Sequence, residues 1–175
     1  MGKVKLKFPK HLWTKADTMR LAMNTLASIK LRTSKGLDAD GQSFQGYSTN
    51  PIYIPIDKGT GARLKPKGGR TSRTGNSVFY EEGYQQYKEE SRKRGGPDDS
   101  AEVDLVLSGA LMNNLVVLQT TQTKFTIGLT SHVQHYGYYV NEKREYIGLS
   151  SKDVDILNMT VQEEIKRKFD KESKK

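Results

Sequence analysis

Two histidines, His132 and His135, have the spacing that places side chains on one face of a helix. A pair of imidazoles can begin a zinc site, but a complete site needs a third protein ligand. The chain has no cysteine, and the nearest suitably spaced carboxylate, Glu142, lies seven residues beyond His135. We therefore expect exposed or hydrogen-bonded histidines and no metal site.

A glycine-rich run at residues 59–65 resembles a phosphate-binding loop only superficially. It lacks the Gly-Lys-Ser/Thr ending that places a hydroxyl on magnesium, and no clear strand and helix flank it. Ser108 and Gly109 likewise lack the flanking pattern of a nucleophile elbow. The sequence therefore predicts no catalytic residue, no cofactor and no enzymatic activity.

Asp38, Asp40 and Gly41 begin like a calcium-binding loop. Such a loop needs a glutamate at its twelfth position, where this chain has Thr49. Aspartate and glycine both favour turns, so a tight turn after a helix explains the Asp-Ala-Asp-Gly sequence better.

Five cations lie within residues 63–73 of a glycine-rich segment that has no acidic residue between Asp57 and Glu81. They are Arg63, Lys65, Lys67, Arg70 and Arg73. Evenly spread cations suit contact with phosphates without reading of bases, and the net charge of +9 favours an anionic partner. No aromatic residue is interleaved, so stacking on single strands is poorly supported. Two other interpretations stay open, namely a solvated loop and an arm that grips an acidic neighbouring subunit.

The elements that must position these residues begin with a helix from about 14 to 34, opened by a Thr14–Asp17 capping box. Met19, Met23 and Leu26 recur at helical spacing and are expected to fill a core. Residues 36–101 are expected to form an arm or insertion rich in glycine and proline, with an edge strand or extended arm near Pro55 and a helix at about 77–94. In that helix three tyrosines form one stripe: Tyr80, Tyr84 and Tyr87.

The second half of the chain alternates strands and helices. It predicts strands at 102–107 and 145–149, a short helix after Ser108, a hairpin over 115–130, a helix over 131–141, and a final helix opened by a Ser150–Asp153 capping box. The expected fold is α+β: one domain over 1–175, with a small antiparallel sheet, N-terminal and C-terminal helices packed against it, and a long extended arm or loop insertion.

No apolar run approaches the roughly 20 residues that a transmembrane helix needs. The first residues alternate lysine with apolar side chains over 3–8, which suggests a short strand and lacks the continuous apolar core of a secretory signal. We expect a soluble protein without membrane contact that is intracellular when made.

The order of these pieces resembles the phage virion morphogenesis proteins, a family that includes tail-completion and related head–tail joining proteins. Residues 36–44 look like the family's helix, Asp-x-Asp-Gly turn and aromatic, and 105–111 is similar to its Leu-Ser-Gly-x-Leu signature. Residues 146–150, followed by Asp153, look like its closing segment. The likeness covers about 14–50 and 103–169. The residues that carry it are Asp38, Asp40, Gly41, Ser108, Gly109, Gly148, Leu149 and Ser150.

Two features depart from the family pattern. Members often carry Arg-Pro before the closing aromatic, where this chain has Arg144-Glu145, and the tyrosine-rich segment at 77–94 has no counterpart. The resemblance implies a non-enzymatic structural subunit of the virion at the head–tail junction. It further implies a hexameric or dodecameric ring that meets other neck, portal-adaptor or tail proteins, with the basic run facing either acidic subunits or packaged DNA.

Overall fold

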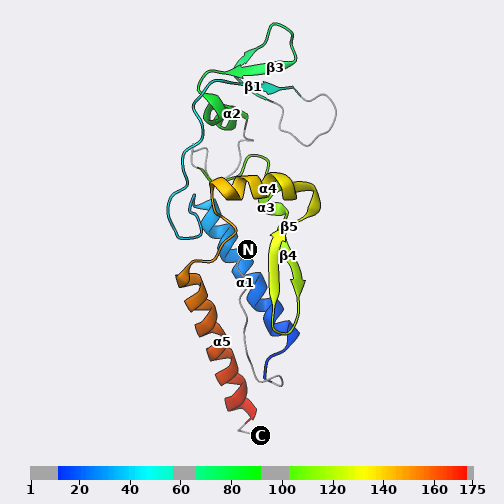
Figure 1. Cartoon of the computed structure of the whole chain (residues 1–175), viewed down its shortest axis with the longest axis vertical. Coiled ribbons are helices and arrows are strands. Elements are labelled where there is room, and N and C mark those ends of the chain that lie inside the picture. The colour runs from blue at the N-terminus through cyan, green and yellow to red at the C-terminus, as the bar shows by residue number, and fades with distance from the viewer. Residues whose placement is uncertain (1–11, 57–65, 92–102, 173–175) are drawn as a thin grey trace. The chain divides into compact units, whose positions relative to one another are not determined.

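The computed structural model describes residues 12–56, 66–91 and 103–172 (Figure 1). The chain divides into two compact units. The terminal unit joins Met1–Phe44 to Leu111–Lys175, and the inserted unit is Gln45–Ala110. Helices and small antiparallel sheets together confirm the α+β class.

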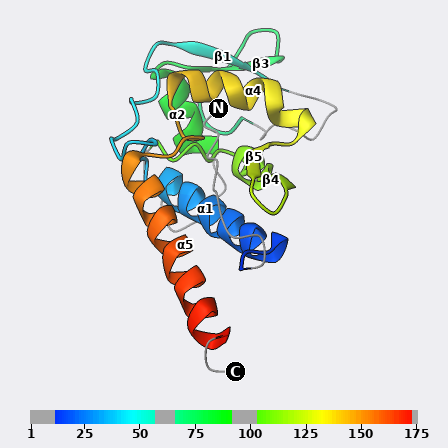
Figure 2. The same cartoon turned by 60° about the horizontal axis from the view of Figure 1, so that its bottom comes forward.

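The terminal unit is built around a long first helix, a β-hairpin and a long last helix (Figures 1 and 2). The first helix packs against the hairpin, and the last helix lies beside the first in both views. Its elements are α1 (Lys15–Ser34), α3 (Ala110–Asn113), β4 (Leu115–Thr120), β5 (Phe125–Leu129), α4 (Ser131–Lys143) and α5 (Ser151–Glu172). The predicted hairpin and the three predicted long helices of this unit are confirmed.

One core cluster joins the two ends of the chain. Trp13, 2% exposed, packs with Leu21 of α1 and Val161 of α5. The Trp13 indole donates a hydrogen bond to Thr18 Oγ1 at 2.7 Å, and that hydroxyl donates to the Gln122 carbonyl at 2.6 Å. A buried polar group must keep hydrogen-bond partners, and this chain of bonds ties α1 to the hairpin loop.

The inward face of α1 differs from the predicted one. Met19 and Met23 are 42% and 52% exposed, so their assignment to the core was wrong. The buried stripe instead includes Leu21, Thr25 and Ile29. Thr25 is tolerated there because its hydroxyl donates to the Leu21 carbonyl at 2.8 Å, which satisfies the buried oxygen within the helix.

Close packing of α4 on the hairpin depends on one glycine. A Cβ at Gly137 would lie 2.0 Å from Leu129 Cδ1 and 2.9 Å from Leu111 Cδ1. Leu129 and its strand partner Leu115 are almost fully buried beneath the helix. A helical glycine normally costs stability, so its presence here reflects the short distance between helix and strand.

The inserted unit contains an antiparallel sheet with strand order β1-β3-β2 and one helix. Its elements are β1 (Ile52–Pro55), β2 (Arg70–Thr71), β3 (Ser77–Tyr80) and α2 (Gly83–Ser91). Val78, Tyr80 and Tyr87 form its core, with Ile52 and Ile54 partly buried beside them. The edge position of β1 confirms the expectation from Pro55. The described part of the expected arm is therefore a small sheet and a helix with a core of their own.

The helix predicted at 77–94 was wrong over its first part. Residues 77–80 are strand β3, and the helix begins only at Gly83, whose φ of +69° breaks the chain direction. The tyrosine spacing was misleading because Tyr80 comes from a strand and still meets Tyr87, with ring centroids 5.4 Å apart. Residues 92–94 lie outside the described ranges.

Two predicted strands are absent from the described residues. Residues 103–107 are irregular, with Leu105 in the left-handed region at φ 56°. Residues 145–149 are a loop whose backbone groups find partners elsewhere: the Glu145 carbonyl accepts from Ala39 N at 2.7 Å, and Ile147 N donates to Asn141 Oδ1 at 2.7 Å. The strand expected over 3–8 lies outside the described residues.

Candidate functional site

The first motif of the family resemblance is a turn at the end of α1. Asp38 Oδ1 accepts hydrogen bonds from the backbone nitrogens of Asp40 and Gln42 at 3.0 and 2.8 Å. Gly41 has φ +81°, and its nitrogen donates to the Asp38 carbonyl at 3.1 Å. The carboxylate therefore organises its own loop, as the tight-turn interpretation predicts.

The closing motif packs directly on this turn. A Cβ at Gly148 would lie 2.7 Å from the Cβ of Ala39, so only glycine fits without a shift. The Arg32 guanidinium donates to the carbonyls of Gly148 and Tyr146 at 2.9 and 3.2 Å. Two segments separated by about one hundred residues thus meet at the end of α1.

Arg32 also joins this loop to α5. Its Nη1 lies 2.6 Å from Asp153 Oδ2, and both side chains are mostly buried. Asp153 is at the same time the partner in a capping box, because Ser150 N donates to its carboxylate and Asp153 N donates to Ser150 Oγ, each at 3.0 Å. The predicted capping box is confirmed, and the motif residues have an architectural role in the terminal unit.

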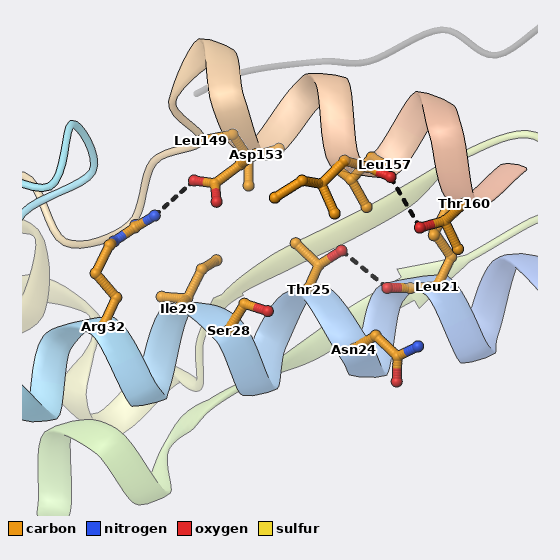
Figure 3. Close-up of a pocket in the computed structure, with 11 residues that line it drawn as sticks. Leu21, Asn24, Thr25, Ser28, Ile29, Arg32, Leu149, Asp153, Leu157 and Thr160 are labelled. Carbon is orange, nitrogen blue, oxygen red and sulfur yellow. Dashed lines mark hydrogen bonds and ion pairs between the residues drawn. The ribbon is translucent and has the colours of Figure 1, made fainter.

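A groove runs between α1 and α5 beside this ion pair (Figure 3). The space between its walls, including open solvent, is about 480 Å³. Leu21, Ile29 and Leu157 supply apolar lining, Leu149 lies at the end near Asp153, and the dashed contact between Arg32 and Asp153 crosses that end. The lining holds no pair of groups suited to acid–base or nucleophilic chemistry, since its only opposite charges neutralise each other.

Ser108 and Gly109 belong to the inserted unit, whereas the other two motifs belong to the terminal unit. Ser108 Oγ accepts from Ala110 N at 3.3 Å, and Gly109 has φ +80°. This is the start of the short helix α3, as predicted, and the exposed hydroxyl has the geometry of a turn rather than of a nucleophile.

The basic run is only partly described. Arg63 and Lys65 lie outside the described residues, while Lys67, Arg70 and Arg73 are exposed. The backbone at Lys67 is fixed, because its nitrogen donates to Ser91 Oγ at 3.1 Å and its carbonyl accepts from Tyr80 Oη at 2.6 Å. The described cations therefore sit on and beside the β2–β3 hairpin.

Sequence reasoning missed the aromatic residues that accompany these cations. Arg70 is the cross-strand partner of Phe79, and its guanidinium lies 5.3 Å from that ring. Tyr53 is the partner of Phe79 on the other side, with ring centroids 4.9 Å apart. Both aromatics lie outside the basic run, and only strand pairing could have revealed their proximity.

The inserted unit also buries an ion pair that the sequence analysis did not find. Lys88, 2% exposed, contacts the carboxylate of Asp104 and donates to Tyr47 Oη at 3.1 Å. Asp104 also accepts from Val106 N at 2.9 Å. Buried opposite charges need such partners, so this pair links α2 to the segment that follows residue 103.

Helix α4 carries both histidines of the pair singled out in the sequence. Both are exposed on α4, and His132 Nδ1 lies 3.4 Å from Thr130 Oγ1. Within the described part of the chain, no group of three metal-ligating side chains comes together.

Asp17 has the most perturbed carboxylate in the terminal unit. Burial opposes its ionisation, but hydrogen bonds from Lys168 and Thr14 outweigh burial and lower its pKa from 3.8 to about 2. Thr14 donates from both its nitrogen and its hydroxyl, at 2.8 and 2.7 Å. Asp17 thereby caps α1 and holds α5 to it.

We expect acid to weaken the terminal unit through this residue. The folded-state pKa is depressed, so the stabilisation, about 2 kcal/mol, is complete above a pH of about 4 and is lost as the pH falls towards 2. In urea titrations followed by Trp13 fluorescence, the free energy of unfolding of Asp17→Asn should be lower than that of the unchanged chain by this amount at neutral pH. At the acid end of the range the two free energies should be equal. Asp170→Asn, which removes an exposed carboxylate of α5, should retain the original acid dependence. Equal acid dependence of Asp17→Asn and the unchanged chain would contradict the assignment.

The terminal unit exposes many large apolar side chains. They are Met19, Met23 and Leu31 on α1, Leu118 on β4, Tyr136 and Tyr139 on α4, and Ile156, Met159 and Phe169 on α5. Where such groups form a contiguous patch, they are typical of surfaces that other molecules cover.

Comparisons with protein-family models, with curated proteins and with solved structures gave no match to this chain. Across the described ranges, none of the helices has the length and apolar composition to cross a bilayer. The function is therefore inferred from the residues and structure of this chain alone.

Proposed function

We propose that this chain is a structural virion protein at a phage head–tail junction, a connector or tail-completion subunit that forms a homo-oligomeric ring. The observation that carries the proposal is the exposed apolar surface of α1 and β4. Met19 and Met23 are one helical turn apart, and the Met19 sulfur accepts a hydrogen bond from Thr120 Oγ1 of β4 at 3.7 Å. Leu118 is exposed on the same strand.

Ring assembly gives this surface a role. Subunits of a ring meet through heterologous contacts, in which one patch of each subunit faces a different patch of the next, and repeated rotation closes the ring. Methionine suits such contacts because its side chain adapts to irregular partners. The sequence resemblance, whose turn and closing motifs pack together in the terminal unit, supports the same function.

The proposal is tested by particle assembly. In a phage whose gene for this chain is interrupted, we expect heads and tails to accumulate unjoined in electron micrographs. The unchanged chain and Asn24→Glu should restore joining, whereas Met19→Glu combined with Met23→Glu should not, because two charges would be buried in the subunit interface. Asn24 is exposed on the same helix and serves as the matched control.

Native mass spectrometry of the same three purified chains tests the ring directly. We expect a closed hexamer or dodecamer for the unchanged and control chains and a loss of assembly for the double variant. Normal joining without this chain, or its absence from mature particles, would overturn the proposal. The alternative function, a nucleic-acid-binding module without catalytic activity, is favoured by the exposed Lys67, Arg70 and Arg73.

A further inference from the structure

The sheet of the inserted unit has two chemically different faces. Side chains alternate along a strand, so Val78 and Tyr80 of β3 point to one face and Phe79 to the other. The first face packs on Tyr87 of α2, which lies on one side of this sheet (Figure 1). The Phe79 face is the outer one.

A row of three side chains crosses this outer face. Tyr53, Phe79 and Arg70 are consecutive cross-strand partners on β1, β3 and β2. Tyr53 is 62% exposed, and the Arg70 guanidinium lies over the ring of Phe79. The row therefore presents an aromatic ring and a cationic plane to solvent side by side.

The charge around the row has one sign. Arg70 and Arg73 are exposed, and residues 66–80 contain no acid. Glu90 of α2 lies beside Gly68, which precedes β2. Because α2 covers the inner face, this carboxylate does not belong to the outer row.

We infer that this outer face, the Tyr53–Phe79–Arg70 row, is a binding site for single-stranded nucleic acid. An unpaired base stacks on the exposed Tyr53 ring or on the Arg70 guanidinium, and neighbouring phosphates meet Arg73. Exposed aromatics in a groove or sheet of positive charge recognise single strands in this way. A duplex offers no free base face, so it gains only the phosphate contacts.

The inference does not depend on ring assembly. It concerns a face of the inserted unit, whereas the ring proposal rests on α1 and β4 of the terminal unit. It also changes the interpretation of the basic run, because strand pairing supplies the aromatics that the run itself lacks.

The test is fluorescence anisotropy of the full chain with a labelled oligothymidylate of about ten nucleotides at low salt. Tyr53→Ile keeps a strand-forming residue and removes the ring, and we expect about 5- to 100-fold weaker binding. Tyr53→Phe should bind like the unchanged chain. Tyr139→Ala removes an equally exposed tyrosine of α4 and should have no effect.

Arg70→Ala should weaken binding. The slope of log affinity against log salt concentration should also become shallower by about 0.7, the change expected when one phosphate contact on a single strand is lost. A duplex of the same length should bind more weakly than the single strand. Unchanged binding by Tyr53→Ile, equal affinity for the duplex, or displacement of the oligonucleotide by polyglutamate at equal charge would overturn the inference. The last result would assign the face to an acidic protein partner.

Because assembly is read separately with the Met19 and Met23 variants, failure of one proposal is distinguishable from failure of the other. Circular dichroism and urea titration of Tyr53→Ile establish that any loss of binding is not a loss of folding.

Discussion

Replacing Lys88 with alanine is expected to destabilise the inserted unit by about 3 to 5 kcal/mol, because it removes the ammonium that contacts the buried Asp104 carboxylate. The cost has two sources: the lost ion pair with Asp104 and the lost contact with Tyr47, whose ring lies 4.5 Å from the ammonium. Hydrogen exchange, read by mass spectrometry on peptides from 66–91, should show faster exchange in the variant.

A paired change separates charge from packing. Lys88→Met combined with Asp104→Leu removes both charges and keeps most of the volume, so its stability should lie within about 1 to 2 kcal/mol of the unchanged chain. Lys67→Ala is the control, because that side chain is exposed in the same unit. Lys93 does not serve as a control because it lies outside the described residues. If Lys88→Ala were as stable as the paired variant, the ion pair between Lys88 and Asp104 would be unimportant for stability.

Tyr146→Ala should be about equally damaging in the terminal unit, with a loss of about 3 to 5 kcal/mol. Tyr146 is fully buried, and its hydroxyl donates to the Gly137 carbonyl at 3.3 Å. Burial raises the pKa of this phenol, so it stays neutral at ordinary pH. Truncation would leave a cavity below α4 that the closely packed helix cannot fill.

Tyr146→Phe provides the matched comparison. It keeps the ring and removes one hydrogen bond, so we expect a loss of only about 1 kcal/mol. Urea unfolding followed by Trp13 fluorescence reports both variants, since this tryptophan is buried in the same unit. Equal losses for alanine and phenylalanine would mean that the hydroxyl, not the ring, matters most.

Local signals predicted the helices and hairpin of the terminal unit well. The capping boxes at Thr14 and Ser150 are complete within four residues, and the same hydrogen bonds form in the structure. Alternation over residues 125–129 similarly defines β5 without reference to distant residues. Such features are predictable because both partners are neighbours in the sequence.

Features that depend on distant partners were missed. Strand β3 pairs with β1 and β2, which lie elsewhere in the chain. Val78, Phe79 and Tyr80 are strand-forming residues, but the helical spacing of the tyrosines was given more weight. The phase of α1 was misjudged because threonines replace apolar residues on its inner face while methionines remain exposed. Thr25 has a local partner in the Leu21 carbonyl, whereas Thr18 donates to the distant Gln122 carbonyl. Polarity alone cannot indicate which threonines find such partners.

The functional surface was predictable only in part. The cations of the basic run were identified, but their aromatic neighbours Tyr53 and Phe79 became visible only through strand register. The buried Lys88–Asp104 pair has no sequence signal beyond two charges of opposite sign, because most such pairs remain in solvent.

The core that joins Trp13 and Leu21 to Val161 has a consequence for synthesis on the ribosome. The inserted unit is continuous in sequence and can fold once residue 110 has emerged, whereas the terminal unit waits for α5. At roughly 5 to 20 residues per second, the interval between translation of Trp13 and of Val161 is about 7 to 30 seconds. During that interval the apolar face of α1 lacks its final cover, so we expect nascent chains to depend on chaperones most strongly at this stage.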